Sequence, residues 1–415
     1  MHLREKFVAL LRWSERYTKT DMVYLAEGSF WLTLSKVLGI GASFLTSIAF
    51  ANLLPEETYG IYRYVLSVMT ILVIPTLGGI DAALTRVVAR GSSGTIRPAF
   101  RVEARWGLLG TLASVGLAGY YFFQGNSVLA LSFLIASVFI PVMDPANIFL
   151  AYLSGKKNFK SQTYSQTIIR AGSSLCIILT VFITDSITTL LLVYFSSYTF
   201  LRLAFFLVTL RKVPRGAPVD LSAISYGKHL TLMKVPGIIS AQLDKILVFH
   251  YIGGAALAGY YLALLPFKQM QNLLGSVNVL ALPNFSLQDT QTLKATLPRK
   301  MLQSYAVIIP VLLLYILLAR FFFTVIYPQY TDFVLISQLF MLQLLFFPLS
   351  LFNTAITAIA DKRKLYIQST VIPTFRIVAI ATLVPLYGIG GGVTAILATS
   401  ILNAALTIYL FAKLK

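Results

Sequence analysis

The chain has 415 residues, of which 57% are hydrophobic and only 12% are charged, and its net charge is +19. Soluble domains carry about a quarter charged residues, so this composition excludes a soluble protein and predicts a polytopic membrane protein. Most of the bases lie between apolar stretches, which indicates membrane topology rather than nucleic-acid binding. The single cysteine, Cys176, excludes an intrachain disulfide and a cysteine-based metal site. No metal or cofactor is expected.

Residues 1–27 precede the first long apolar stretch and are rich in bases. They contain no cleavage site of small residues after a short apolar core, so we do not expect a removable signal peptide. Apolar residues recur at helical spacing within residues 3–14. We therefore predict an amphipathic helix that lies on the cytoplasmic surface of the membrane.

Apolar stretches long enough to span a membrane make up most of the remaining chain. A bilayer core of about 30 Å needs about 20 apolar residues in a helix. On this measure we predict twelve transmembrane helices, at residues 28–52, 61–83, 105–123, 128–151, 163–184, 187–210, 230–252, 258–284, 302–326, 333–356, 366–386 and 390–412. The fold class is therefore an all-α polytopic membrane protein.

The connections between these helices alternate in charge. The even-numbered connections are basic, whereas the odd-numbered ones are short and contain acids such as Glu56, Glu57, Asp185 and Asp332. The positive-inside rule places the basic connections and both termini in the cytoplasm. We expect a multi-pass protein of a bacterial or archaeal cytoplasmic membrane. The outward connections are too short for a catalytic domain, so an enzyme is not expected.

An internal repeat divides the chain into two halves. Residues 32–40 and 230–238 are identical at seven of nine positions, and each copy is followed by a glycine-aromatic turn, at residues 58–62 and 257–261. We expect a first lobe at 28–210, a cytoplasmic linker at 211–229 and a second lobe at 230–415. Repeats of this kind are typical of secondary transporters, in which the substrate site lies between the halves near the bilayer midplane.

Several basic side chains fall inside the predicted helices. A charge at the centre of a membrane helix costs ~2.5–3.5 kcal/mol, so these bases must face a wet cavity or a counter-ion. The candidates for a cationic substrate site are Lys36, Arg170, Lys234, Lys245, Lys268 and Arg376. Arg202 and Arg320 lie closer to helix ends, and we expect them to reach the interface.

This excess of positive charge favours an anionic ligand. Lysine supplies a compact charge and arginine a planar fork, which together suit a diphosphate. Lys268 and Arg376 are the deepest and have no acid in their own helix. Two alternatives stay open, because Lys36 and Arg170 could extend to the interface and Lys245 could pair with the adjacent acid Asp244.

Three acids and two prolines complete the candidates. Asp81, Asp144 and Asp244 could bind a coupling proton or cation. Asp144 lies between two prolines, so it could instead cap a break in its helix. Pro236 and Pro373 lie within a turn of a candidate base and are expected hinges, although proline also forms ordinary kinks in membrane helices.

The segments at 52–62, 77–86, 242–249 and 258–263 resemble the polysaccharide transporters of the multidrug/oligosaccharidyl-lipid/polysaccharide (MOP) exporter superfamily, which include the Wzx-type O-antigen flippases. This resemblance implies two six-helix lobes around a central cationic cavity. It also implies that polyprenyl-diphosphate-linked oligosaccharides cross from the inner to the outer leaflet by alternating access. The implied partners are this lipid-linked glycan, membrane lipids and polysaccharide-assembly enzymes. A monomer is expected.

Three alternative functions remain. A cation-coupled drug antiporter of the same superfamily would need acids in its cavity, whereas this chain has six candidate bases and three acids. A lipid II flippase resembles the same plan but usually has fourteen spans. A membrane enzyme of polysaccharide assembly would need a large extramembrane loop, which the predicted topology does not provide.

Overall fold

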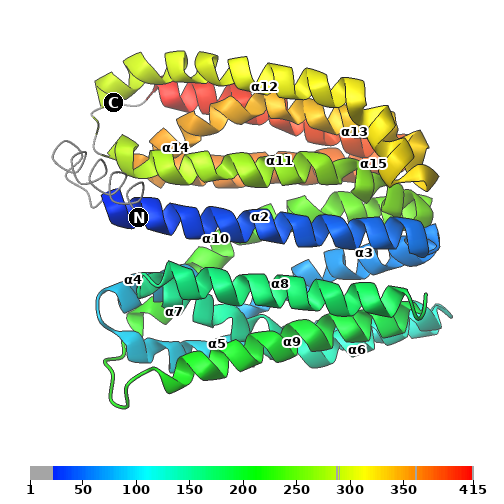
Figure 1. The fold of residues 1–415 in the computed structure, drawn as a ribbon, viewed down its shortest axis with the longest axis horizontal. Helices are drawn as coiled ribbons and strands as arrows, with labels where there is room; N and C mark the ends of the chain where they lie inside the picture. Colours follow the sequence, from blue (N-terminus) through cyan, green and yellow to red (C-terminus); the bar gives the residue numbers. More distant parts are fainter. Residues whose placement is uncertain (1–21, 287, 289, 360–361, 414–415) are drawn as a thin grey trace, which may run out of the picture.

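A computed structural model describes residues 22–286, 288, 290–359 and 362–413. Every regular element in these ranges is a helix. Most of the predicted amphipathic segment, residues 1–21, lies outside the described residues. Within them, the long helices run side by side along the longest axis of the molecule (Figure 1).

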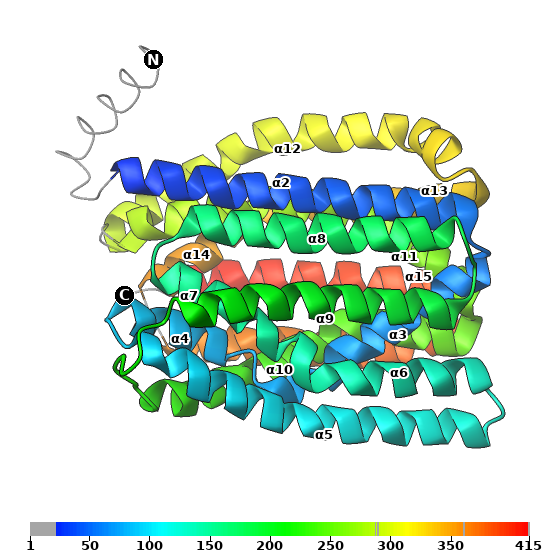
Figure 2. The same ribbon diagram turned by 60° about the horizontal axis from the view of Figure 1, so that its bottom comes forward.

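The first half of the chain forms one group of helices. Figure 2 shows α2, α8, α9, α6 and α5 lying side by side in this order, and each packs against the next. The elements of this half are α2 (Met22–Leu53), α3 (Glu56–Leu72), η1 (Ile74–Thr76), α4 (Ile80–Ala89), η2 (Ser93–Thr95), α5 (Ile96–Phe123), α6 (Ser127–Met143), η3 (Pro145–Ile148), α7 (Phe149–Gly155), α8 (Phe159–Val181) and α9 (Ile187–Arg211).

The second half forms the other group, in which α10 packs on α15 and α11 packs on α13 and α14. Figure 1 shows α11 to α15 on one side of the molecule and α4 to α9 on the other, with α2, α3 and α10 between them. The elements of this half are α10 (Ser222–Ile252), α11 (Gly254–Ser286), α12 (Thr290–Ile326), η4 (Pro328–Phe333), α13 (Val334–Met341), η5 (Leu342–Leu349), α14 (Ser350–Ala358) and α15 (Lys362–Ala412).

The described residues pass along the bundle twelve times, as the sequence predicts. By length and composition, eight helical stretches could each cross a membrane. One of them is α15, although this element makes two passes. It is a hairpin, because the backbone reverses at Gly388 (φ 58°) and Lys364 Nζ at its start donates to the carbonyl of Lys413 beyond its end at 2.8 Å. The remaining passes are α8, α10 and α11, whose polar residues lower their hydropathy.

Breaks in the helices fall at some of the prolines. Because proline has no N–H to donate, Pro75 and Pro145 lie in the short 3-10 segments η1 and η3. The break that was predicted beside Asp144 is therefore confirmed. By contrast, α10 and α15 stay helical through Pro236 and Pro373.

The connection between the halves is short. It spans residues 212–221, because α10 already begins at Ser222 within the expected linker. Near its end, the carboxylate of Asp220 accepts hydrogen bonds from the hydroxyl and the backbone N–H of Ser222, at 2.6 and 3.0 Å. These bonds stabilise the charged form and lower the pKa of Asp220.

The two halves meet closely along α3, α4, α10 and α11. A Cβ atom at Gly60 of α3 would lie 1.8 Å from the carbonyl oxygen of Gly254, so only glycine allows this approach of α3 to α11. Just before α4, the backbone N–H of the N-cap residue Gly79 donates to the hydroxyl of Thr231 on α10 at 2.9 Å.

Further contacts join the halves at the end of the bundle away from the first residue of α2 and the last residue of α15. Ser47 and Tyr327 share a hydrogen bond of 2.8 Å between their hydroxyls. The carboxylate of Glu57 accepts from the backbone N–H of Ala255 at 3.0 Å. The rings of Tyr64 and Phe249 stack with their centroids 4.0 Å apart. We call these contacts the distal closure.

Candidate functional site

A cavity of about 420 Å³ lies between the halves and is lined by residues of α2, α3, η3, α7, α8, α9 and α11. A second cavity, of about 250 Å³, shares Arg63 and Leu66 with it. A third, of about 290 Å³, shares Ile40, Arg170 and Asn272 with the first. Because they share walls, we treat the three as one space and call it the central cavity.

Among the described residues that line the central cavity, every charged side chain is a base. These bases are Lys36, Arg63, Arg170, Arg202, Lys245 and Lys268. They come from α2, α3, α8, α9, α10 and α11, so the positive charge surrounds the cavity instead of following one helix. Charges buried in this way need an opposite charge or water.

Lys36 and Arg170 lie together on one wall of this cavity. Arg170 reaches across from α8 to α2, where a Cβ atom at Gly39 would lie 2.3 Å from its Nη1. Gly39 therefore leaves the space that the guanidinium group occupies. The Gln166 side chain of α8 accepts from the Ser35 hydroxyl at 2.9 Å and ties the same two helices together.

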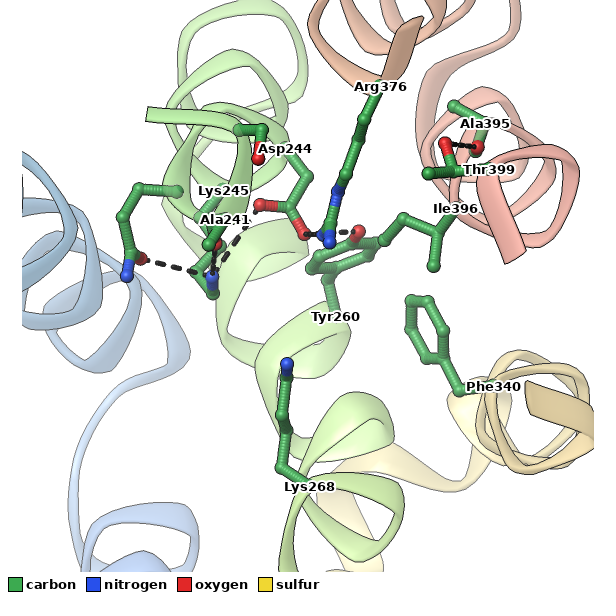
Figure 3. Close-up of polar contacts among 12 residues, drawn as sticks. Ala241, Asp244, Lys245, Tyr260, Lys268, Phe340, Arg376, Ala395, Ile396 and Thr399 are labelled. Carbon is green, nitrogen blue, oxygen red and sulfur yellow. Dashed lines mark hydrogen bonds and ion pairs between the residues drawn. The ribbon is translucent and has the colours of Figure 1, made fainter. Parts of the chain in front are cut away.

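Lys245 and Lys268 line the part of the cavity beside α3. The ammonium group of Lys245 donates to the carbonyl of Ala241 at 2.7 Å and to the side chain of Gln242 at 3.1 Å. It also lies 3.5 Å from Asp244. In Figure 3, the Lys268 side chain extends from α11 toward this group.

Arg376 approaches the same carboxylate from the other side and does not line the central cavity. Its guanidinium group lies 3.8 Å from Asp244, whose side chain is fully buried. The Tyr260 hydroxyl donates to the same oxygen of Asp244 at 3.0 Å, as Figure 3 shows. We call Asp244, Lys245, Tyr260 and Arg376 the Asp244 cluster.

The Asp244 cluster explains how several bases can be buried together. One carboxylate balances one of its two bases, and the nearby Lys268 adds a third. The group therefore keeps a positive excess on the side that faces the cavity. The alternative that Lys245 pairs with its neighbouring acid is confirmed, and the same lysine also lines the cavity.

Lys234 lies apart from these residues. It is exposed on α10 and lines none of the cavities described here, and it interacts electrostatically with Asp81 of α4. Its repeat partner, Lys36, lines the cavity. The matched lysines of the two halves are therefore not equivalent in their surroundings.

Arg202 differs from expectation, because it does not extend to the interface. It lines the central cavity, and its Nη1 atom lies 2.8 Å from Asp144 and donates to the carbonyl of Met143 at 3.1 Å. The broken helix at η3 leaves that carbonyl without its usual helical partner. Arg202 thus supplies a hydrogen-bond donor to the free carbonyl at the helix break and places a positive charge at the cavity wall.

Arg63 and Glu103 are two charged groups that the sequence predictions missed. The predicted span 61–83 places Arg63 at its very start, but α3 begins at Glu56, so Arg63 lies two turns inside the helix. Its guanidinium carbon lies 3.7 Å from the ring centroid of Tyr261, an arrangement typical of a cation–π contact. Pro55 followed by two glutamates is a sequence signal for the start of a helix, and it would have placed Arg63 inside α3.

Glu103 is 3% exposed and lies in α5, which begins nine residues earlier than the predicted span. Its Oε1 atom has no hydrogen-bond partner among the described residues. It interacts electrostatically with Asp81 and Asp144. The predicted ion-coupling acids Asp81 and Asp144 therefore have a third carboxyl group near them, outside the lining of the central cavity.

Comparison with solved structures identifies the fold. An outward-facing multidrug resistance MATE family transporter of the MOP superfamily superposes with a TM-score of 0.61 and 13% identity, over 93% of this chain and 94% of that chain. Lipid II flippase MurJ, in an inward closed conformation, gives a TM-score of 0.62 and 14% identity, over 92% and 87%. At these identities the likeness shows the fold alone.

Comparison by sequence shows the family. A search of curated proteins finds no match. A family profile described as "Polysaccharide biosynthesis protein" matches residues 25–287, which is more than half of the chain. The chain is therefore a multi-pass membrane protein with the fold of the MOP superfamily, and it belongs to the polysaccharide biosynthesis protein family.

Proposed function

We propose that the protein is a flippase that moves a polyprenyl-diphosphate-linked oligosaccharide from the cytoplasmic to the outer leaflet. The observation that carries this proposal is the lining of the central cavity, which has six bases and no acid among the described residues. Membership of a polysaccharide biosynthesis family and the transporter fold support it.

A diphosphate needs such a cavity to cross a membrane. Transfer of an isolated charged group from water into hydrocarbon costs on the order of tens of kcal/mol. Arginine side chains such as Arg63, Arg170 and Arg202 can bind phosphate oxygens with two parallel hydrogen bonds. Lys268 and Lys36 add compact, mobile charges. In this proposal the polyprenyl tail stays in the bilayer while the diphosphate lies in the cavity.

Alternating access supplies the movement between leaflets. The distal closure joins the halves at the end of the bundle away from the chain ends, and we propose that this state receives substrate from the cytoplasm. Opening of the distal closure, with closure of the opposite end, then exposes the cavity to the outside. Bending at Pro236 and Pro373 remains a proposal for how the helices adapt.

A cation-coupled drug antiporter is the second candidate, because the superposing structures include multidrug transporters. Its cationic substrate would meet six bases in the cavity lining, and like charges would repel it. The acids that could attract a cation lie behind this lining, in the Asp244 cluster or near Glu103. The cavity therefore favours the flippase.

Transfer of a fluorescent polyprenyl-diphosphate saccharide across proteoliposome bilayers tests the proposal. Wild-type protein should move the lipid, and Lys268→Ala and Arg170→Ala should each lower the rate at least tenfold, as expected for the loss of a charge-assisted hydrogen bond. Arg320→Ala is the matched control, because Arg320 is exposed on α12 and lines none of the described cavities.

Two results would contradict the proposal. The first is a wild-type protein that moves no lipid but exports a cationic dye under a proton or sodium gradient, which would support the antiporter. The second is an equal loss of rate in Arg320→Ala and in the cavity variants, which would show that the cavity bases have no specific role.

A further inference from the structure

A separate cavity lies inside the second half, between α11, η5, α14 and α15. Its volume is about 260 Å³, and none of its described lining residues is charged. Its polar lining consists of amides and hydroxyls, at Gln271, Gln343, Ser350, Asn353, Ser400 and Asn403. The rings of Phe267, Phe346 and Phe347 form apolar parts of its wall. We call this space the amide pocket.

The amide pocket adjoins the central cavity across α11. Gln271 and Gly275 line both spaces, and Lys268 lies one turn away on the same helix. The positions 268, 271 and 275 share one face of a helix. A ligand held by the bases of the central cavity could therefore place an uncharged group in the amide pocket without leaving the protein.

Three amide side chains of this pocket offer a ligand both donors and acceptors. The side chain of Asn403 makes no hydrogen bond with any residue that the structure describes. Gln343 donates its amide to the carbonyl of Phe340 at 3.1 Å, which leaves its oxygen to accept. The oxygen of Asn353 accepts from Gln368 and from Thr407, which orients its amide nitrogen as a donor.

This chemistry distinguishes between possible ligands. A sugar hydroxyl both donates and accepts, so it matches amides that present both functions. A phosphate or carboxylate would find no positive charge in the wall. An acyl or prenyl chain would leave several buried amides without partners, which is unfavourable. The aromatic rings offer apolar surface to the face of a pyranose ring.

We propose that the amide pocket binds one neutral sugar of the lipid-linked saccharide, a hexose or an N-acetylhexosamine, while the diphosphate lies among the bases of the central cavity. Its volume is slightly below the usual range for ligand sites, so it accommodates a single sugar and not the whole glycan. This inference rests on the proposed function and adds a preference for the chemistry of the substrate.

Binding of short-chain probes to purified protein tests it. The probes are farnesyl diphosphate and its conjugates with glucose, N-acetylglucosamine and glucuronic acid. Wild-type protein should bind at least one neutral conjugate about tenfold more tightly than farnesyl diphosphate, the gain of one or two good hydrogen bonds. The glucuronic acid conjugate should show a smaller gain, because its carboxylate has no cationic partner in the pocket.

Two pocket variants should remove this gain. Asn403→Leu and Gln343→Met keep the approximate volume but lose hydrogen bonds, so the neutral conjugates should bind no better than farnesyl diphosphate, whose own affinity should not change. Thr382→Ala is the control, since Thr382 lies on α15 outside the pocket lining and its hydroxyl donates to the carbonyl of Val378 at 2.9 Å. Thermal unfolding of each variant verifies that it is folded. Two independent variants are used so that the test remains valid if one of them does not fold.

The outcomes separate the two proposals. If no neutral conjugate binds more tightly than farnesyl diphosphate, or if the pocket variants weaken all probes equally, the sugar subsite is overturned. The flippase proposal then still stands, provided that farnesyl diphosphate binds and Lys268→Ala weakens it. If wild-type protein binds none of the diphosphates, the proposed function itself fails.

Discussion

At Asp244 a carboxylate without exposed surface accepts a hydrogen bond from Tyr260 and lies near two bases. Burial of a charge is favourable only where partners replace water. The carboxylate therefore holds Lys245 and Arg376 in place beside the cavity, and these bases in turn permit its burial. A buried acid outside the cavity lining can in this way set the positive charge beside the cavity.

The first prediction at this scale concerns the stability of the Asp244 cluster. Asp244→Asn keeps the shape of the side chain but leaves two bases without their negative partner. Removal of one partner of a buried pair costs about 3–5 kcal/mol, so the apparent Tm in detergent should fall clearly. Asp185→Asn is the control because Asp185 is exposed. An unchanged Tm for Asp244→Asn would show that the cluster does not stabilise the fold.

The second prediction concerns the space that Gly39 leaves for Arg170. A Cβ at Gly39 would displace the flexible guanidinium group, whereas a Cβ at Gly41, on the same helix, would have no atom within 4 Å. Replacing glycine by alanine inside a helix stabilises the helix by roughly 0.5–1 kcal/mol. Gly39→Ala should therefore lower lipid transfer without loss of Tm, and Gly41→Ala should transfer lipid normally. Equal rates in both variants would argue against a role for the position of Arg170.

At the scale of the elements, the two halves depend on a close approach of α3 and α11. Gly60 faces the Gly254 carbonyl, and the carboxylate of Glu57 accepts from the backbone N–H of Ala255 in the first turn of α11. The positive end of a helix dipole favours such a carboxylate. The Glu57 contact belongs to the distal closure and Gly60 lies one turn from Glu57 on α3, so a change at either residue should alter the balance between the two proposed access states.

The third prediction tests this balance in a cysteine-free background made by Cys176→Ser. Gly60→Ala should separate α3 from α11 and open the distal closure, because a Cβ cannot fit against backbone atoms. A cysteine in place of Ser47, which is fully buried, should then react faster with a polar thiol reagent. Gly116→Ala, a substitution into open space on α5, should leave the reactivity unchanged. Slow labelling in both variants would show that this glycine contact does not hold the end closed.

At the scale of the whole molecule, twelve passes bring all the basic connections to one end of the bundle. This end also holds the first residue of α2 and the last residue of α15 (Figure 1). Clusters of Lys and Arg beside membrane helices stay in the cytoplasm. The orientation of the cavity and the direction of transport both depend on this placement.

The fourth prediction is the orientation itself. In the cysteine-free background, Asp185→Cys, in the connection between α8 and α9, should react with an impermeant thiol reagent added to whole cells. Arg215→Cys, between α9 and α10, should react only after the membrane is opened. The reverse pattern would invert the topology and, with it, the proposed direction of transport.

The sequence by itself determined the number and approximate position of the membrane passes, and it showed the internal repeat and the surplus of intramembrane bases. It could do so because the bilayer imposes length and apolarity on each span, and these properties are local. It also located the helix break beside Asp144, since proline acts on its own backbone. Only the tertiary structure decided which bases share a cavity, because this depends on the rotation and packing of helices far apart in sequence. It placed Arg63 and Arg202 in the lining, left Lys234 outside and joined Arg376 to Asp244 across α10 and α15.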